Sequence, residues 1–116
     1  MTVKIEFFTD FIESTLPIIR LTKSRNKTTG TATFLFIRPS VFNAMQNKFD
    51  CLKTMSLLWD NKSIRTSDIT ILFSKGRPFL LKSIFVFKNA NEWFQFLNFM
   101  QHYCNETGVS FTKFQP

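Results

Sequence analysis

Cysteine, glycine, proline and acidic residues are all scarce in this chain of 116 residues, which has two Cys, three Gly, four Pro and eight Asp or Glu. Cys51 and Cys104 lie far apart, without a CxxC or a histidine spacing, so neither a disulfide framework nor a metal site is expected. No run approaches the roughly 18 apolar residues of a membrane-spanning helix, and no charged-then-apolar leader opens the chain. We therefore expect one soluble domain over residues 1–116, in a reducing compartment.

Signatures of catalysis are also missing. The single histidine, His102, is predicted to lie on the solvent side of a helix, away from any acid that could orient it. An S-x-x-K pattern at Ser24–Lys27 falls in a predicted turn instead of at a helix start, so chance explains it. Walker, GxSxG and GxGxxG motifs are absent, and no two acids form a close pair. We expect no enzyme, no catalytic residue, no metal and no cofactor.

What the chain has in quantity is phenylalanine, with sixteen residues, and a series of strand-like runs. The second run starts at Pro17, which lacks an N–H, so we expect that arm near a sheet edge. Gly30 is expected to supply a positive φ in the turn that follows. The next run is β-branched and aromatic throughout and is predicted to be a central strand. The runs are 3–8, 17–23, 31–37, 52–59, 64–73 and 79–87.

The surest element is a helix from about Asn89 to Gly108. Asn89 with Glu92 three residues later is a capping-box pattern, and glycine is typical of a helix end. One face is apolar and is predicted to pack on the sheet: Trp93, Phe96, Leu97, Met100, Tyr103 and Cys104. A short helix near residues 40–48, capped by Ser40, also fits the pattern. The predicted class is α+β, an antiparallel β-sheet with a C-terminal amphipathic helix packed on it, and this helix closes the chain.

Positive charge is concentrated in two stretches. The net charge is +7, and no acid occurs between Ser14 and Phe49, where Arg20, Lys23, Arg25, Lys27, Arg38 and Lys48 lie. A second acid-free stretch, Ile69–Asn91, contains Lys75, Arg77, Lys82 and Lys88. Three interpretations stay open: a solvated basic face, an RNA-binding sheet, or docking on an acidic or membrane-associated surface. The absence of an RNP1-like run weighs against RNA.

The order of residues narrows these alternatives. RLTKSR at Arg20–Arg25 and TGTATF at Thr29–Phe34 closely resemble the signature hairpin of the Psb28 family of photosystem II assembly factors. The chain departs from the family at Asn26-Lys27, where the family's turn resembles Asp-Gly, and in its more basic region Asp60–Pro78. The likeness continues nearly to the end of the chain, through Gly76-Arg77-Pro78, Asn91-Glu92-Trp93, Phe96, Phe99-Met100, Tyr103, Gly108 and Phe111.

That resemblance implies a non-enzymatic accessory factor that binds transiently to assembly or repair intermediates of photosystem II. The expected contacts are the C-terminal tail of the inner-antenna subunit and the stromal loops of the reaction-centre subunits, where the factor protects the quinone and iron region. It implies a peripheral location on the stromal side of the plastid thylakoid membrane, or the cytosolic side of a bacterial one, and a monomer when free. An exposed sheet edge would accept a partner's tail as an added strand.

The hairpin is the expected contact. The residues predicted to bind the partner are Arg20, Lys23, Ser24, Arg25, Lys27, Thr29 and Gly30. The local cations, and not the net charge, are the expected determinant, because acid-rich family members would dock on the same complex. No nucleic acid is expected as a partner, and the alternative function is a small basic RNA-binding module.

Overall fold

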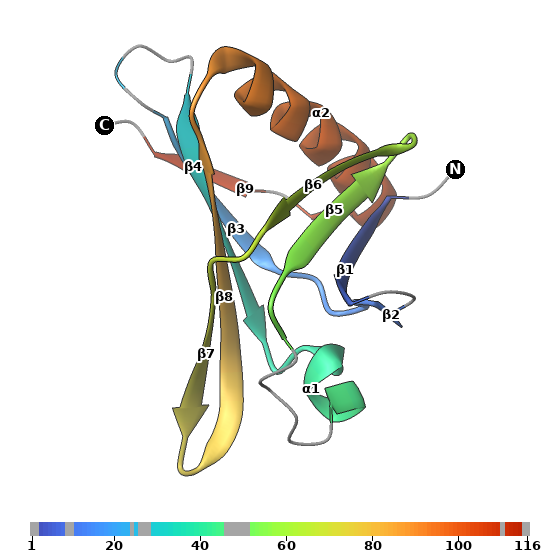
Figure 1. Cartoon of the computed structure of the whole chain (residues 1–116), viewed down its shortest axis with the longest axis vertical. Helices are drawn as coiled ribbons and strands as arrows, with labels where there is room; N and C mark the ends of the chain where they lie inside the picture. The colour runs from blue at the N-terminus through green and yellow to red at the C-terminus, as the bar shows by residue number, and fades with distance from the viewer. Residues whose placement is uncertain are drawn as a thin grey trace.

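Two β-sheets face each other in the computed structural model, and a long helix lies across one end of both (Figure 1). The structure describes residues 3–8, 11–23, 25, 29–45, 52–109 and 111–114, the last four through their backbone alone. The four-stranded sheet has the order β2-β1-β5-β6, with β1 (Lys4–Phe8), β2 (Phe11–Ile12), β5 (Met55–Trp59) and β6 (Lys62–Thr66). The five-stranded sheet has the order β7-β8-β4-β3-β9, with β3 (Ile18–Lys23), β4 (Gly30–Ile37), β7 (Ile69–Ser74), β8 (Arg77–Phe87) and β9 (Phe111–Phe114).

Side chains that alternate along the strands fill the space between the sheets. The rings of Phe7 on β1 and Phe36 on β4 meet edge to face across this space, with centroids 5.4 Å apart. Ser83 on β8 is fully buried, and its hydroxyl donates to the sulfur of Met55 on β5, at 3.2 Å. The five-stranded sheet contributes more buried apolar side chains than the four-stranded sheet: Ile19, Leu21, Ala32, Phe34, Phe36, Leu81, Phe85 and Phe87.

The long helix α2 (Ala90–Thr107) begins and ends as its sequence predicts. Asn89 Oδ1 accepts a hydrogen bond from the Glu92 N–H at 2.9 Å, and Glu92 Oε1 accepts one from the Lys88 N–H at 2.8 Å. At the other end Gly108 adopts φ 79° and donates to the Cys104 carbonyl at 2.9 Å. These bonds satisfy backbone groups that the first and last turns of a helix leave without partners.

The buried face of α2 is wider than the predicted one. Its buried residues are Trp93, Phe96, Phe99, Met100 and Tyr103, while Leu97 and Cys104 are only partly buried. Phe99 was missed because the prediction placed the helix against one sheet. In the structure Phe99 packs edge to face on Trp59 of the four-stranded sheet, with centroids 5.4 Å apart. A helix that spans two sheets buries a broader stripe than one that covers a single sheet.

The short helix α1 (Ser40–Met45) confirms the start of the helix predicted near residues 40–48, of which 46–48 lie outside the described residues, and Val41, Phe42 and Met45 are buried. Its first turn is held by Glu13, which is 7% exposed. Glu13 Oε2 accepts from the backbone N–H and the hydroxyl of Ser40, at 2.8 and 2.7 Å, and from the Thr15 N–H at 2.9 Å. Glu13 Oε1 accepts from the Val41 N–H at 2.9 Å. The Glu13 carboxylate, which comes from a distant part of the chain, thus caps α1 in place of a local residue.

The predicted α+β class and the central position of the 31–37 strand are confirmed, since β4 pairs with β3 on one side and β8 on the other. The helix does not close the chain, however. β9 follows α2 and pairs with β3 in parallel, from Ile19↔Phe111 to Thr22↔Phe114. The arm that starts near Pro17 is therefore an interior strand and not an edge. Proline is tolerated there because it precedes the first ladder bond of β3.

The predicted run 64–73 is wrong as a single strand, because the chain changes sheet in its middle. β6 ends at Thr66, and β7 starts at Ile69 in the other sheet. The Thr66 hydroxyl donates to the Ile84 carbonyl of β8 at 2.6 Å and accepts from the Asp68 N–H at 3.1 Å, which fixes the crossing point. The predicted run 52–59 is also shorter, since β5 starts at Met55. Periodicity cannot reveal a change of sheet, because both strands alternate in the same way.

Candidate docking surface

The end of the five-stranded sheet next to the start of α2 carries the predicted basic hairpin (Figure 1). Lys23 is the last residue of β3 and pairs with Gly30, the first residue of β4. Arg25 follows and is exposed, Thr29 is half-buried, and Ser24 and Lys27 lie outside the described residues. The structure therefore gathers Lys23, Arg25, Thr29 and Gly30 at one end of the hairpin.

Arg20 lies apart from this group, on the same strand but three residues further into the sheet. It is exposed, pairs with Thr33 of β4 and lies opposite Thr112 of β9. Its side chain is on the outer face of the sheet, since Ile19 and Leu21 on either side of it are buried, as the alternation predicts. The predicted set is thus divided between the hairpin end and the outer face.

Gly30 has a different role from the predicted one. It is a β-strand residue and is not among the described residues with positive φ, whereas Gly76 and Gly108 both have φ 79°. A side chain at Gly30 would collide with the ring of Trp93 and with the Thr22 backbone. The glycine is needed for close approach between the hairpin and α2, a requirement that only the packing of the helix reveals.

The outer face of the five-stranded sheet is a feature that the sequence interpretation missed. Exposed apolar side chains stand on it beside the threonines and the two cations, Arg20 and Lys82. Ile18 on β3 is 50% exposed and Val86 on β8 is 60% exposed. The available signal was that apolar residues such as Ile18, Leu35 and Val86 also occupy the outward positions of β3, β4 and β8, which is typical of strands that carry apolar side chains on both faces.

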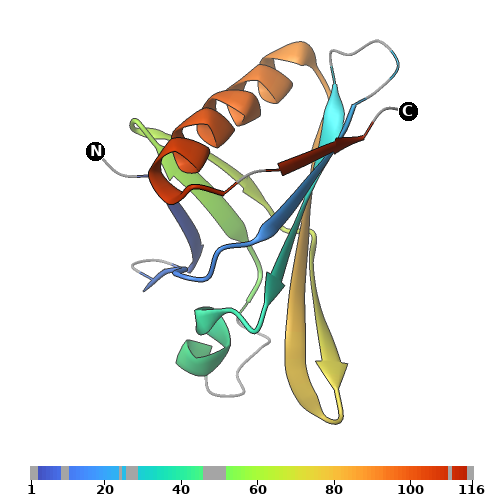
Figure 2. The same cartoon turned by 180° about the vertical axis from the view of Figure 1, so that it is seen from behind.

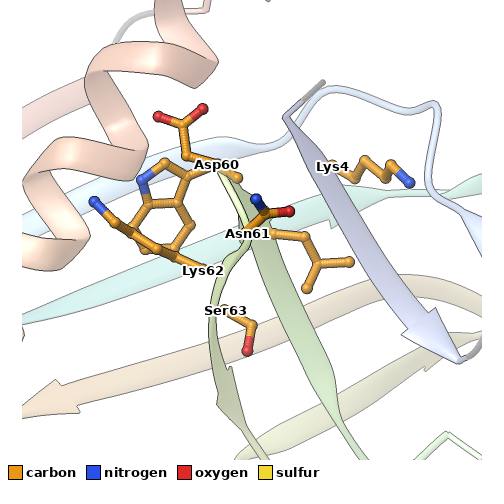
Figure 3. Close-up of a pocket in the computed structure, with 7 residues that line it drawn as sticks. Lys4, Asp60, Asn61, Lys62 and Ser63 are labelled. Carbon is orange, nitrogen blue, oxygen red and sulfur yellow. The ribbon is translucent and has the colours of Figure 1, made fainter. Parts of the chain in front are cut away.

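A shallow hollow of about 370 Å³ lies on the other sheet, at the turn between β5 and β6 (Figure 3). Asp60 and Asn61 form this turn with φ 45° and 60°, and Lys4 of β1 stands across from them. The hollow is lined by Lys4, Leu58, Trp59, Asp60, Asn61, Lys62 and Ser63. Within the described ranges, no three His, Cys, Asp or Glu residues lie close enough together to hold a metal ion.

His102 does have an acid beside it, contrary to the prediction. Its Nε2 lies 3.3 Å from Asp60 Oδ2, and its Nδ1 lies 2.8 Å from the Asn98 carbonyl one turn earlier in α2. Asn98 accepts a hydrogen bond from the Trp59 indole N–H at 2.7 Å. His102 was predicted to lie away from the core, but the turn between β5 and β6 lies against that side of α2. The two contacts join α2 to β5 and support the fold.

Burial determines the behaviour of the two titratable groups near the end of α2. Tyr103 is 5% exposed, and burial, with smaller contributions from Cys104 and Glu13, raises its pKa to about 12. Burial also raises the pKa of the Cys104 thiol. A thiol held in its protonated form is a poor nucleophile. Cys51 lies outside the described residues.

No helix in the described part of the chain is both long enough and apolar enough to cross a lipid bilayer. The exposed features of the described surface are therefore the basic hairpin end, the outer sheet face and the ends of the sheets. These exposed features are suited to binding another surface, and the hollow at the β5–β6 turn is shallow.

Comparison with known proteins identifies the family. The family model "Psb28 protein" matches residues 5–111. A "Photosystem II reaction center Psb28 protein" from Trieres chinensis is 35% identical over 113 residues, which cover 97% of this chain and 98% of that protein. A protein of the same name from Nostoc sp. is 36% identical over 110 residues, with 95% and 97% coverage. One from Guillardia theta is 33% identical over 109 residues, with 94% coverage of each chain. The chain belongs to the Psb28 family.

Proposed function

We propose that this protein is a non-enzymatic accessory factor that binds transiently to assembly or repair intermediates of photosystem II. The observation that carries the proposal is the family match over residues 5–111, together with relatives that are named as photosystem II reaction center proteins and are similar over their whole length. The factor acts at the stromal or cytosolic face of the thylakoid membrane. It contacts the inner-antenna tail and the reaction-centre loops and protects the quinone and iron region during biogenesis.

The proposed contact is the basic end of the β3–β4 hairpin, with Lys23, Arg25, Thr29 and Gly30 and their sequence neighbours Ser24 and Lys27. Lysine and arginine at the end of a hairpin suit the carboxylates and carbonyl oxygens of a partner's loops, because charge-assisted hydrogen bonds are the stronger ones. Arg20 extends this contact onto the outer face of the sheet. The packing of Trp93 against Gly30 holds the hairpin end in a fixed position relative to α2.

An extended tail of the partner would bind as an added strand. The edge nearest to the basic hairpin end is β9, because it runs parallel to β3 and pairs Phe114 with Thr22, one residue before Lys23. A tail added there would gain main-chain hydrogen bonds and would reach the cations at the same time. This arrangement requires no bond making or breaking by the protein and no cofactor.

An RNA-binding module is the alternative, and it finds less support. Sheets that bind single-stranded RNA stack bases on aromatic side chains exposed on the sheet surface. The outward side chains of β3, β4 and β8 are aliphatic residues, threonines and cations, and the phenylalanines Phe34, Phe36, Phe85 and Phe87 of β4 and β8 are buried on the opposite side. The exposed rings of Phe73 and Phe79 lie at the far end of the β7–β8 hairpin, away from this central surface.

The proposal can be tested by native gel electrophoresis of membranes from illuminated cells that express the tagged protein. We expect the tagged chain to co-migrate with an incomplete photosystem II complex. The variant Lys23→Ala with Arg25→Ala should lose this co-migration. The control variant Lys62→Ala with Arg65→Ala removes two exposed cations from β6, on the other sheet, and should keep it.

Two outcomes would contradict the proposal. Recovery of the tagged protein with RNA, and its release by nuclease, would favour the alternative function. Equal loss of co-migration in both double variants would show that net charge and not the hairpin end determines binding, since each variant removes two positive charges. Circular dichroism of the purified variants should show an unchanged fold, because all four side chains lie at the surface.

A further inference from the structure

The hairpin of β7 and β8 projects from the end of the molecule opposite to the basic β3–β4 end (Figures 1 and 2). β4 ends at Ile37, which pairs with Leu80 of β8. β8 continues outward for three more residues, Arg77–Phe79, with β7 beside it through the pairs Phe73↔Pro78 and Ser74↔Arg77. Three residues of strand extend the tip about 10 Å beyond the last β4–β8 pair. We call residues 72–80 the finger.

The finger exposes large apolar side chains. Phe73 is 55% exposed, Leu72 46% and Phe79 37%, and Ile37 at the base of the finger is 48% exposed. Exposed phenylalanines are unfavourable in water and are unusual at the projecting end of a hairpin. The turn itself is open, since no heavy atom lies within 4 Å of a Cβ built on Gly76. The tip thus carries exposed apolar side chains beside an open turn.

Cations surround these rings. Lys75 and Arg77 are exposed in and beside the turn, and the guanidinium of Arg38 lies 5.6 Å from the centroid of the Phe79 ring. No Asp or Glu occurs in the sequence from Ile69 to Asn91, so the finger carries positive charge without a compensating acid of its own. The combination of aromatic rings at a tip with lysine and arginine around them matches the polar–apolar boundary of a bilayer with anionic lipids.

We propose that the finger is a membrane-contact element that inserts Phe73 and Phe79 into the headgroup boundary of an anionic lipid bilayer, with Lys75, Arg77 and Arg38 at the lipid phosphates or sulfonates. A lipid surface fits better than a protein partner, because the finger is narrow and convex. A stable protein interface buries about 800 Å² on each partner, more than such a tip offers. The inference is independent of the proposed function, since it concerns the purified chain and lipid alone.

The test is co-sedimentation of the purified full chain with vesicles of phosphatidylcholine that contain about one third phosphatidylglycerol, compared with pure phosphatidylcholine vesicles. We expect binding to the anionic vesicles alone, weakened by salt. The variant Phe73→Thr with Phe79→Thr should bind at least tenfold more weakly. Threonine keeps the strand propensity of the finger but removes both rings.

A second pair of variants tests whether the position of the cations matters or only the net charge of the chain. Lys75→Asn with Arg77→Gln removes two cations at the finger and should weaken binding by at least tenfold, at about fivefold for each cation. Asparagine is chosen at Lys75 because this residue has φ 52°. The matched control, Lys23→Ala with Arg25→Ala, removes the same charge at the opposite end and should change binding by less than twofold. Equal weakening of vesicle binding in the two variants would contradict the proposal that the finger contacts the lipid.

Insertion itself is measured with Phe73→Trp. The difference in emission between this variant and the unaltered chain should shift to shorter wavelength on anionic vesicles and should be quenched by lipids with brominated acyl chains. Vesicle binding without any response of this tryptophan would overturn the proposal. So would a dimer in solution that is lost in Phe73→Thr with Phe79→Thr, because it would show that a second copy of the chain covers the finger.

Discussion

The indole ring of Trp93 lies directly against the backbone of Gly30. A Cβ atom built on Gly30 would be 2.8 Å from Cζ3 of Trp93 and 2.6 Å from the backbone oxygen of Thr22. Both distances are shorter than side-chain carbons tolerate, and one of the two neighbours is backbone. The first residue of β4 and the first turn of α2 are therefore packed as one unit, and the basic hairpin end is attached to it.

Gly30→Ala should destabilise the protein by about 1–3 kcal/mol, the usual result of overpacking a well-filled site. The added methyl group must displace either the Trp93 ring or the hydrogen-bonded strand β3. Urea denaturation followed by circular dichroism measures the loss. Thr31→Ala, one residue further along β4, changes a half-buried outer side chain and should cost less than about 1 kcal/mol. A Gly30→Ala variant as stable as Thr31→Ala would contradict the observed contact.

Trp93→Ala should cost about 3–5 kcal/mol, because the ring is 1% exposed and packs on Phe87 and Phe96. Its neighbour in the helix supplies the control. Phe94 is 60% exposed, and Phe94→Ala should stay within about 0.5 kcal/mol of the unaltered chain. Chemical denaturation compares the two variants. The reverse ranking would mean that the rotation of α2 about its axis is different from the one described.

Glu13→Ala should destabilise the protein by about 1–3 kcal/mol, since three donors at the start of α1 and the Thr15 N–H between β2 and β3 lose their common acceptor. The stability of Glu13→Gln should lie between those of Glu13→Ala and the unaltered chain, because an amide offers one acceptor oxygen where the carboxylate offers two. Ser14→Ala is the control. The Ser14 hydroxyl is exposed and donates only to the Ser40 hydroxyl, at 3.1 Å, so its loss should cost little. Hydrogen exchange of the α1 amides would show whether the loss is local.

Tyr103 makes stability depend on pH at the alkaline end. Its pKa is raised by burial from 10.0 to about 12. Below pH 10 the phenol is protonated in both the folded and the unfolded chain, so its contribution is fully present. Between pH 10 and 12 the unfolded chain releases the proton while the folded one retains it, and stability falls as pH rises through this window.

The chain has one tyrosine, so ultraviolet absorbance of tyrosinate follows this group alone. The native chain should titrate near pH 12 or at the point where it unfolds, and the denatured chain near pH 10. Tyr103→Phe removes the titrating group and should flatten the fall in stability over this window. A native titration near pH 10 would show that the phenol is in contact with water.

The strand pattern and both ends of α2 were predictable from local sequence. Alternation along β1, β3 and β4 indicates which side chains are buried, since a strand has a period of two whatever its partners are. Asn89 and Gly108 define the helix because capping depends on residues within one turn of each end. The family was also evident from the order of residues in the hairpin, and the comparisons confirm it.

Partnerships between distant segments were decided by the tertiary structure alone. The change of sheet after Thr66, the pairing of β9 with β3 and the use of Glu13 to cap α1 each join residues whose local sequence is compatible with several partners. The same holds for Gly30, which looked like a turn glycine until Trp93 was seen to lie against it. Local periodicity determines which face of an element is apolar, but the identity of what covers that face depends on the packing of the whole chain.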